Sequence, residues 1–203
     1  MKTVITACDI PLAGEVVVAF GSIITMDARD LARARGVAIR EVAKNEVPVV
    51  LTPAKTVALG SDHGGFVMKE ALKPLLAELG MVVKDLGVHQ GETADYPDPA
   101  LAVAETVASG AALRGILVDG AGIGSAMAAN KVPGIRAALC YDRATARNSR
   151  EHNHANVLTL GGRMLTQTQA EDVVRTWLAT PYGGGRHQGR IDKITAIERK
   201  YSK

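Results

Sequence analysis

An acidic side chain and a glycine-rich loop follow an apolar run in the middle of this 203-residue chain. The run "GILV" (115–118) ends at Asp119, and Gly120, Gly122 and Gly124 follow. Glycines let backbone N–H groups approach an anion closely, and the start of a following helix directs further N–H groups toward it. The stretch predicts either an anion-binding loop beside a carboxylate or a plain tight turn. Because the next helix is expected to begin near Gly124, Asp119 is not expected to be a simple helix cap.

The stretch "SDHGGF" (61–66) is a second candidate, because it also follows an apolar run. His63 could contact an anion, and Asp62 could hold a hydroxyl group. Asp62 could instead cap the helix that follows. Capping alone does not account for an Asp-His pair followed by two glycines.

A polar cluster in "REHNHANV" (150–157) contains His152, Asn153 and His154. His152 could move a proton near neutral pH. Alternatively the cluster ends a helix, with Asn153 in the left-handed conformation and His152 near the helix dipole. A metal site is disfavoured, because no carboxylate or cysteine stands at ligand spacing from the histidines.

Arginines form the last group of candidates. Arg186 and Arg190 stand four positions apart in "GGGRHQGR" (183–190), so on a helix they would share one face and could clamp a phosphate. Arg163 follows another apolar run. Each arginine could equally be a solvated basic residue.

These groups need a framework, and from residue 56 onward strand-like and helix-like stretches alternate. The expected strands are 56–60, 81–87, 115–118, 135–140 and 156–161. The expected helices are 66–80, 95–110, 142–152, 168–180 and 189–203. This alternation predicts βαβ units and a parallel sheet, with ligands at the carboxyl ends of its strands.

Residues 1–55 have a different pattern. Short strand-like stretches at 4–10, 15–26 and 47–52 accompany a helix-like stretch at 27–36. We expect a small N-terminal module or extension over 1–55, joined near 46–55 to a main domain over 56–203. A long arm packed on the main domain is the alternative.

Composition narrows the class of protein. Hydrophobic residues make up 47% of the chain and aromatic residues 3%, so the core must be aliphatic. A net charge of +3 without a basic run argues against a nucleic-acid partner. Cys8 and Cys140 form no disulfide framework, which favours a reducing cytoplasm. No apolar run approaches the roughly 18 residues of a membrane span, and the N-terminus does not resemble a secretory signal.

Taken in order, these stretches resemble the ribose-5-phosphate isomerase B family, which also includes the galactose-6-phosphate isomerase subunits. The resemblance runs unbroken from about residue 57 to residue 200. It is carried by "GSDHGGF" (60–66), "DYPD" (95–98), "GAGIG" through "AANKVPGIRAAL" (120–139), "HNHANVL" (152–158) and "GGRHQGR" (184–190).

The resemblance implies an α/β, Rossmann-like three-layer fold with a five-stranded parallel sheet, in a homodimer or higher homo-oligomer with sites at the subunit interface. It implies isomerisation of a phosphorylated sugar through an enediolate, without metal or cofactor, ribose 5-phosphate to ribulose 5-phosphate being the first candidate. His152 would assist ring opening. The residues implied to bind substrate are Asp62, His63, Tyr96, Gly120, Ala121, Gly122, Ile123, Gly124, Asn153, Arg163, Arg186 and Arg190. Of these, His63 and the three arginines would hold the phosphate, and the backbone of 120–124 would stabilise the enediolate.

Two departures from the family matter. Its loop reads Cys-Gly-Thr-Gly, with the cysteine as base, whereas here Asp119 and Ala121 replace the cysteine and the threonine. The family's His-Asn-Asp motif corresponds to His152, Asn153 and His154 here, so a histidine replaces its aspartate. We expect Asp119 to be the base, since a carboxylate can take a proton from a sugar carbon. The alternatives are a non-catalytic phosphosugar-binding or partner subunit, and an isomerase of a six-carbon sugar phosphate.

The first 45 residues carry a second resemblance. "VITACDIPLA" (4–13) and "GSIITMDARDLARARGVAI" (21–39) are similar to short leader segments of enzymes encoded with bacterial microcompartments. This resemblance implies a targeting or assembly role, and so a cytoplasmic protein that acts inside a microcompartment or forms part of its structure. An oligomerisation arm is the alternative.

Overall fold

A computed structural model of the chain describes residues 4–5, 10, 14–43, 55–90 and 92–202. The chain forms two compact units, Met1–Lys55 and Thr56–Lys203. The strand predicted at 47–52 and Cys8 lie outside the described residues. Within the described part of the chain, no helix is long and apolar enough to cross a membrane.

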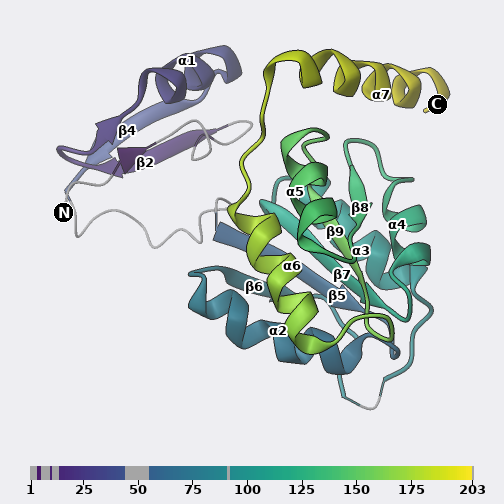
Figure 1. Cartoon of the computed structure of the whole chain (residues 1–203). Coiled ribbons are helices and arrows are strands. Elements are labelled where there is room, and N and C mark those ends of the chain that lie inside the picture. The colour runs from purple at the N-terminus through teal and green to yellow at the C-terminus, as the bar shows by residue number, and fades with distance from the viewer. Residues whose placement is uncertain (1–3, 6–9, 11–13, 44–54, 91, 203) are drawn as a thin grey trace. The chain divides into compact units, whose positions relative to one another are not determined.

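The larger unit is an α/β fold with a five-stranded parallel sheet, which confirms the predicted fold class (Figure 1). Its strands lie in the order β6-β5-β7-β9-β8. Their bounds are β5 (Thr56–Ser61), β6 (Val82–Asp85), β7 (Arg114–Asp119), β8 (Ala137–Leu139) and β9 (Val157–Gly161). The helices are α2 (Phe66–Glu78), α3 (Pro97–Ala108), α4 (Ile123–Ala129), α5 (Arg143–Glu151), α6 (Gln167–Ala179) and α7 (Gln188–Tyr201), and a short 3₁₀-helix, η3 (Gly185–His187), precedes α7.

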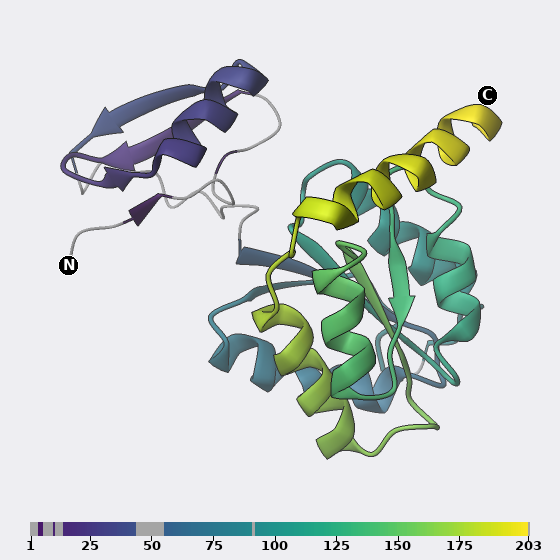
Figure 2. The ribbon, with the colours of Figure 1, turned by 45° about the horizontal axis from the view of Figure 1, so that its top comes forward.

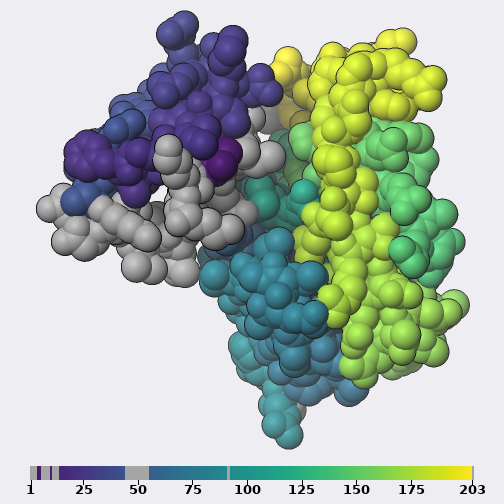
Figure 3. Space-filling model, turned by 60° about the vertical axis from the view of Figure 1, so that its left-hand side comes forward, coloured from purple at the N-terminus to yellow at the C-terminus, as the bar shows by residue number. Residues whose placement is uncertain are grey.

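Helices cover both faces of this sheet. One core joins α2, α5 and α6 to the sheet and contains the fully buried Trp177, and the second core joins α3 and α4 to the other face. Figure 3 shows α2 and α6 side by side, where Arg175 forms an ion pair with Glu78. Every residue of β5 and β9 is buried, as expected for central strands covered on both faces.

Local signals in the sequence set several helix ends. Asp142 and Thr145 form a capping box at the start of α5, and Thr166 and Gln169 form another at α6. Gly80 follows α2 with a φ of 73°, a conformation that favours glycine. These signals fix where α5 and α6 begin and where α2 ends.

Within its described residues, the smaller unit contains two pairs of parallel strands and one helix, α1 (Met26–Arg35). β1 (Val4–Ile5) pairs with β3 (Ile23–Ile24), and β2 (Glu15–Ala19) pairs with β4 (Ala38–Val42). The prediction of one strand over 15–26 is wrong, because a turn at Gly21 divides it. The strand β4 was not predicted, since only Val42 of its five residues is fully buried and the apolar pattern is weak.

A buried lysine links α2 to the end of β6. Lys69 has no exposed surface, and its Nζ donates to both carboxylate oxygens of Asp85 at 2.8 and 2.9 Å and to Val88 O at 2.9 Å. The N–H of Gly87 donates to the same carboxylate, and Lys73 lies 2.5 Å from it. Burial alone would raise the pKa of Asp85, but these donors outweigh burial and lower its pKa to about 2.

We predict that Asp85→Asn lowers the free energy of unfolding by about 2 kcal/mol at pH 7, and by much less near pH 2.5. The folded-state pKa lies below the ordinary 3.8, so this stabilisation is complete above pH 4 and is lost as the pH falls toward 2. Urea unfolding of the parent and of Asp85→Asn at both pH values measures this loss of unfolding free energy. Glu78→Gln is the control, because its ion pair with Arg175 is exposed. An equal loss of unfolding free energy at both pH values would contradict the lowered pKa of Asp85.

Candidate functional site

The order of the strands places a switch point of the sheet at the carboxyl ends of β5 and β7. From β5 the chain passes to β6 on one side, and it later returns to form β7 on the other side. Ligands of open parallel sheets bind at such a switch point, outside the carboxyl ends of the strands. The two loops that flank it begin at Asp62 and at Gly120, so both predicted loops lie at one edge.

The loop after β5 packs tightly against β7. Asp62 Oδ1 accepts a hydrogen bond from the N–H of Gly65 at 2.8 Å, so this carboxylate caps the chain where α2 begins. A Cβ on Gly65 would lie 2.0 Å from Val118 O, which explains the second glycine of the motif. His63 is exposed, and its Nδ1 lies 3.4 Å from Ala94 O. The histidine is therefore accessible at this edge.

Asp119 is the last residue of β7, and its side chain turns into its own loop. Oδ1 accepts from the N–H groups of Ala121, at 2.8 Å, and Gly122, and Oδ2 accepts from the N–H of Ser125 at 2.8 Å. The residue is only 4% exposed, and these three donors offset the cost of burying its charge. Asp119 is therefore more than a helix cap, as expected, because two of its three donors lie in the loop before α4, whose N-cap residue is Gly122. The helix α4 begins at Ile123, and the carboxylate accepts from one N–H group of its first turn, that of Ser125.

Close contacts explain why two positions of this loop are glycine. Gly122 has a φ of 78°, and a Cβ there would lie 2.5 Å from a side-chain carbon of Leu139. Its carbonyl accepts from the buried hydroxyl of Thr159 at 2.8 Å. A Cβ on Gly124 would lie 2.5 Å from the ring of Tyr96. The loop is thus a fixed structure, and Tyr96 covers part of it.

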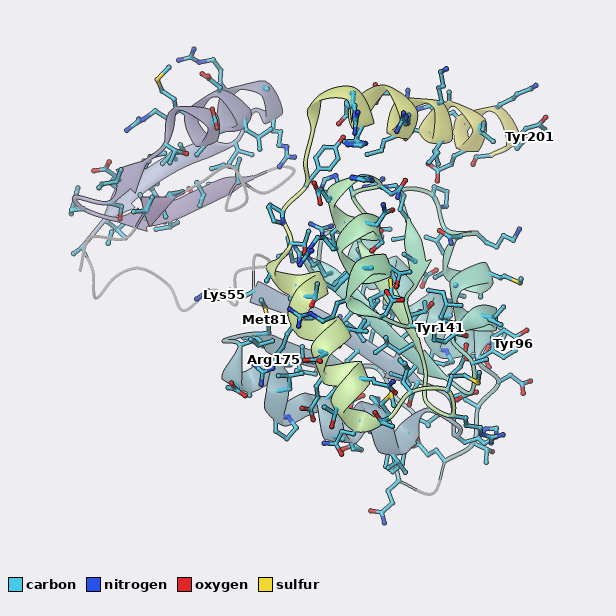
Figure 4. All side chains as sticks on the ribbon, in the orientation of Figure 1. Lys55, Met81, Tyr96, Tyr141, Arg175 and Tyr201 are labelled. Atoms are coloured by element: carbon cyan, nitrogen blue, oxygen red, sulfur yellow. The ribbon has the colours of Figure 1, made fainter. Side chains whose placement is uncertain are left out.

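Two more side chains reach the same edge. Arg163, after β9, lies over both loops: a Cβ on Gly120 would be 3.9 Å from its Nε, and one on Gly64 would be 3.6 Å from an Nη. Tyr141, after β8, donates its hydroxyl hydrogen to Ala121 O at 2.7 Å. Tyr96 and Tyr141 lie on the same side of the larger unit (Figure 4). Tyr141 was not predicted, although its position directly after a strand exit was a usable signal.

No thiol among the described residues reaches this edge. Cys140 is the one cysteine described, is 1% exposed and belongs to the core under α5. Burial raises the pKa of its thiol, so it is a poor source of thiolate. Among the described residues at this edge, Asp119 occupies the position at which the family loop has its cysteine.

His152, His187 and the last two arginines lie at the opposite edge of the sheet. The helix α5 runs back from the carboxyl ends of the strands, so His152, at its C-terminal end, lies where β9 begins. Figure 2 shows the segment between α6 and α7 passing this end of α5, and the N–H of Gly183 donates to Glu151 O. This segment brings Arg186 and His187 to the same place.

His152 stacks on a second histidine. The ring centroids of His152 and His187 are 4.2 Å apart, with 9° between the ring planes. His187 is 8% exposed. Burial lowers the pKa of His187, and the positive charges of His152, Arg186 and Arg190 lower it further, so the ring is neutral near pH 7. Sequence reasoning missed His187, although it stands inside the quoted motif "GGRHQGR".

Arg186 and Arg190 are exposed at this edge, as is Asn153. Across the described ranges, neither arginine forms a hydrogen bond or an ion pair. Asn153 O accepts from Arg136 Nε at 3.1 Å. The left-handed residue is His154, with a φ of 48°, and not Asn153 as in the alternative that the cluster only ends a helix. Because Arg186 and Arg190 are exposed and have no such partner among the described residues, both are free to hold an anion.

The two clusters cannot meet within one chain. β7 pairs with β9 from Gly115↔Val157 to Asp119↔Gly161, and this span is about 13 Å at 3.3 Å per residue. Asp119 lies at one end of it, and His152 lies beyond the other. The predicted residues thus form a carboxyl-edge cluster (Asp62, His63, Tyr96, 119–124 and Arg163) and, together with the unpredicted His187, an amino-edge cluster (His152, Asn153, Arg186, His187 and Arg190).

Known proteins are similar to this chain in sequence and in fold. The Ribose/Galactose Isomerase family profile matches residues 57–194. Ribose-5-phosphate isomerase B of Escherichia coli is 44% identical over 146 residues, which cover 72% of this chain and 98% of that protein. D-erythrulose-4-phosphate isomerase of Pectobacterium atrosepticum is 35% identical over 144 residues, 70% of this chain and 95% of that protein. The structure of Clostridium thermocellum ribose-5-phosphate isomerase B matches with a TM-score of 0.71 and 50% identity, covering 72% of this chain and 99% of that one.

We predict that the imidazole of His154 titrates near pH 4, because burial and then Arg150, Arg136 and Arg114 lower its pKa to about 4. Its ring stacks on Tyr182, with centroids 4.5 Å apart. Two-dimensional NMR of the histidine ring protons as a function of pH measures the midpoint, with His89, exposed on the surface, as internal reference. A midpoint for His154 at or above its ordinary 6.5 would contradict this environment.

Proposed function

The chain belongs to the ribose/galactose isomerase family, and from this premise we propose that it interconverts an aldose phosphate and the matching ketose phosphate. Ribose 5-phosphate is the first candidate substrate. The observation that carries the proposal is the carboxyl-edge cluster, in which a carboxylate, a loop of N–H donors and Arg163 lie together. Such an isomerisation needs a base, a set of donors for an enediolate and an anchor for the phosphate.

In this proposal Asp119 takes the proton from C2 of the sugar and returns it to C1. Its carboxylate must first leave the N–H groups of Ala121, Gly122 and Ser125. Those donors then face the oxygen of the enediolate, so one anion replaces another in the loop. Asp62 and Asn153 would hold sugar hydroxyls.

The phosphate would be held by His63 and Arg163 from one edge and by Arg186 and Arg190 from the other. Because these groups lie at opposite edges of one sheet, we propose a homodimer in which each site combines the carboxyl-edge cluster of one chain with the amino-edge cluster of its partner. His152 would then reach the sugar ring and assist its opening.

One observation favours a second candidate function. With its anion loop already filled by Asp119, the chain could bind a phosphosugar without converting it, as a partner subunit. Exchange of the C2 hydrogen of a bound aldose phosphate for deuterium separates the two functions, since only an isomerase catalyses it. A turnover panel of four-, five- and six-carbon aldose phosphates then identifies the substrate.

For residues 1–55 we propose an assembly or targeting role, in the cytoplasm or inside a bacterial microcompartment. Phe20 and Met26 are 68% and 78% exposed, which gives this unit apolar surface for a partner. Deletion of residues 1–55 should then abolish encapsulation and leave turnover unchanged.

We predict that Asp119→Asn retains phosphosugar binding and loses turnover, because an amide cannot take the C2 proton. Asp119→Cys, which restores the family residue, should retain measurable activity. Steady-state kinetics and calorimetric binding of the same phosphosugar test both variants. Turnover of Asp119→Asn at the parent rate would show that the base lies elsewhere.

We predict that Arg190→Ala weakens phosphosugar binding by about 1.5–3 kcal/mol, the usual contribution of a charge-assisted hydrogen bond. This corresponds to a Kd roughly ten to a hundred times higher. Arg199→Ala, an exposed arginine near the other end of α7, is the matched control and should bind as the parent does. An unchanged Kd for Arg190→Ala would leave His63 and Arg163 as the phosphate anchor.

A further inference from the structure

We propose that Asn148 and His187 are positioning residues for His152, which fix the plane of its imidazole and keep an N–H donor on Nε2. This inference rests on the proposed function, in which His152 assists the opening of the sugar ring. Neither residue was among the predicted site residues. Both contact the imidazole directly, from α5 and from η3.

Asn148 selects the tautomer of His152. Its amide nitrogen, Nδ2, lies 2.9 Å from Nδ1 of His152, and its amide oxygen accepts from Nδ2 of Asn153 at 3.5 Å. Because an amide nitrogen only donates, Nδ1 must accept, and the neutral ring carries its hydrogen on Nε2. The tautomer is assigned from this hydrogen-bond network.

His187 holds the plane of the ring. The two imidazoles are stacked, 4.2 Å apart and 9° from parallel, and His187 is itself 8% exposed. Its Nδ1 is buried without a hydrogen-bond partner among the described residues, so contact with His152 and not hydrogen bonding at Nδ1 accounts for its placement. Since His187 is neutral near pH 7, it does not repel His152 when that ring carries a charge.

The effect that the position of His152 has on turnover depends on the substrate. A five-carbon aldose phosphate closes into a ring, and the bond between C1 and the ring oxygen must break before C2 can lose its proton. An N–H donor placed at that oxygen stabilises the charge that develops on it. A four-carbon aldose phosphate cannot close the same ring, because its terminal oxygen carries the phosphate. The position of His152 therefore matters for the first class and not for the second.

The test compares the parent, His187→Ala and His187→Phe on ribose 5-phosphate and erythrose 4-phosphate. Loss of the stack should lower kcat on ribose 5-phosphate by about tenfold or more, which is part of the roughly 10²–10⁴-fold that a positioned proton-transfer group contributes. Turnover of erythrose 4-phosphate should stay within about twofold of the parent, and His187→Phe should restore most of the loss because it keeps the stack. Equal losses on both substrates, or a Phe variant no better than Ala, would overturn the proposal.

A second measurement does not depend on turnover. Nitrogen-15 NMR of the His152 imidazole in the parent should show the hydrogen on Nε2, and Asn148→Ala should give a mixture of both tautomers. Arg147→Ala, at the neighbouring exposed position of α5, is the control and should leave the tautomer unchanged. A hydrogen on Nδ1 in the parent would overturn the proposal. If no aldose phosphate is turned over, the proposed function fails, while this measurement still decides the role of Asn148.

Discussion

All five strands of the sheet run in the same direction, and this constraint decides where each candidate residue lies. Every strand exit is at one edge, and every helix that returns to start a new strand ends at the other edge. Asp119 follows a strand, whereas His152 follows a helix, so a single chain keeps them apart. A site that uses both must therefore take them from two chains.

The carboxylate of Asp119 is the feature that distinguishes this chain from the family loop that it resembles. A thiol is a weak acceptor, whereas a carboxylate accepts several N–H groups at once. Asp119 accordingly fills the loop with its own charge. In the proposed mechanism this makes the loop an exchange site, in which the carboxylate yields its donors to the enediolate. In a non-catalytic subunit, the same hydrogen bonds to Asp119 would stabilise the fold of the loop.

Sequence patterns predicted the order of the elements of the larger unit because local signals set them. The apolar strands, the capping boxes of α5 and α6 and the glycine after α2 are readable without tertiary contacts. They also placed Asp62, Asp119 and Arg163 at one edge, since residues that follow parallel strands must lie together. In the smaller unit the half-exposed β4 lacked such a signal.

The features that the sequence did not predict depend on contacts between distant residues or on side-chain direction. The orientation of Asp119 follows from a loop whose curvature requires Gly122 in the left-handed conformation. The stack of His152 on His187 joins residues 35 positions apart, through a 3₁₀-helix that no periodicity indicated. Tyr141 reaches the loop because β8 pairs with β9 at the edge of the sheet. None of these contacts has a signature in a single sequence.

The claim that each site combines two chains is tested most directly by complementation. Asp119→Asn and His152→Asn chains carrying different affinity tags would be co-expressed, and the heterodimer purified through both tags. One of its two sites would then contain both original residues and the other neither, so the account predicts about half of the parent turnover from two inactive variants. A heterodimer as inactive as either homodimer, beside a doubly tagged parent of full activity, would contradict the composite site.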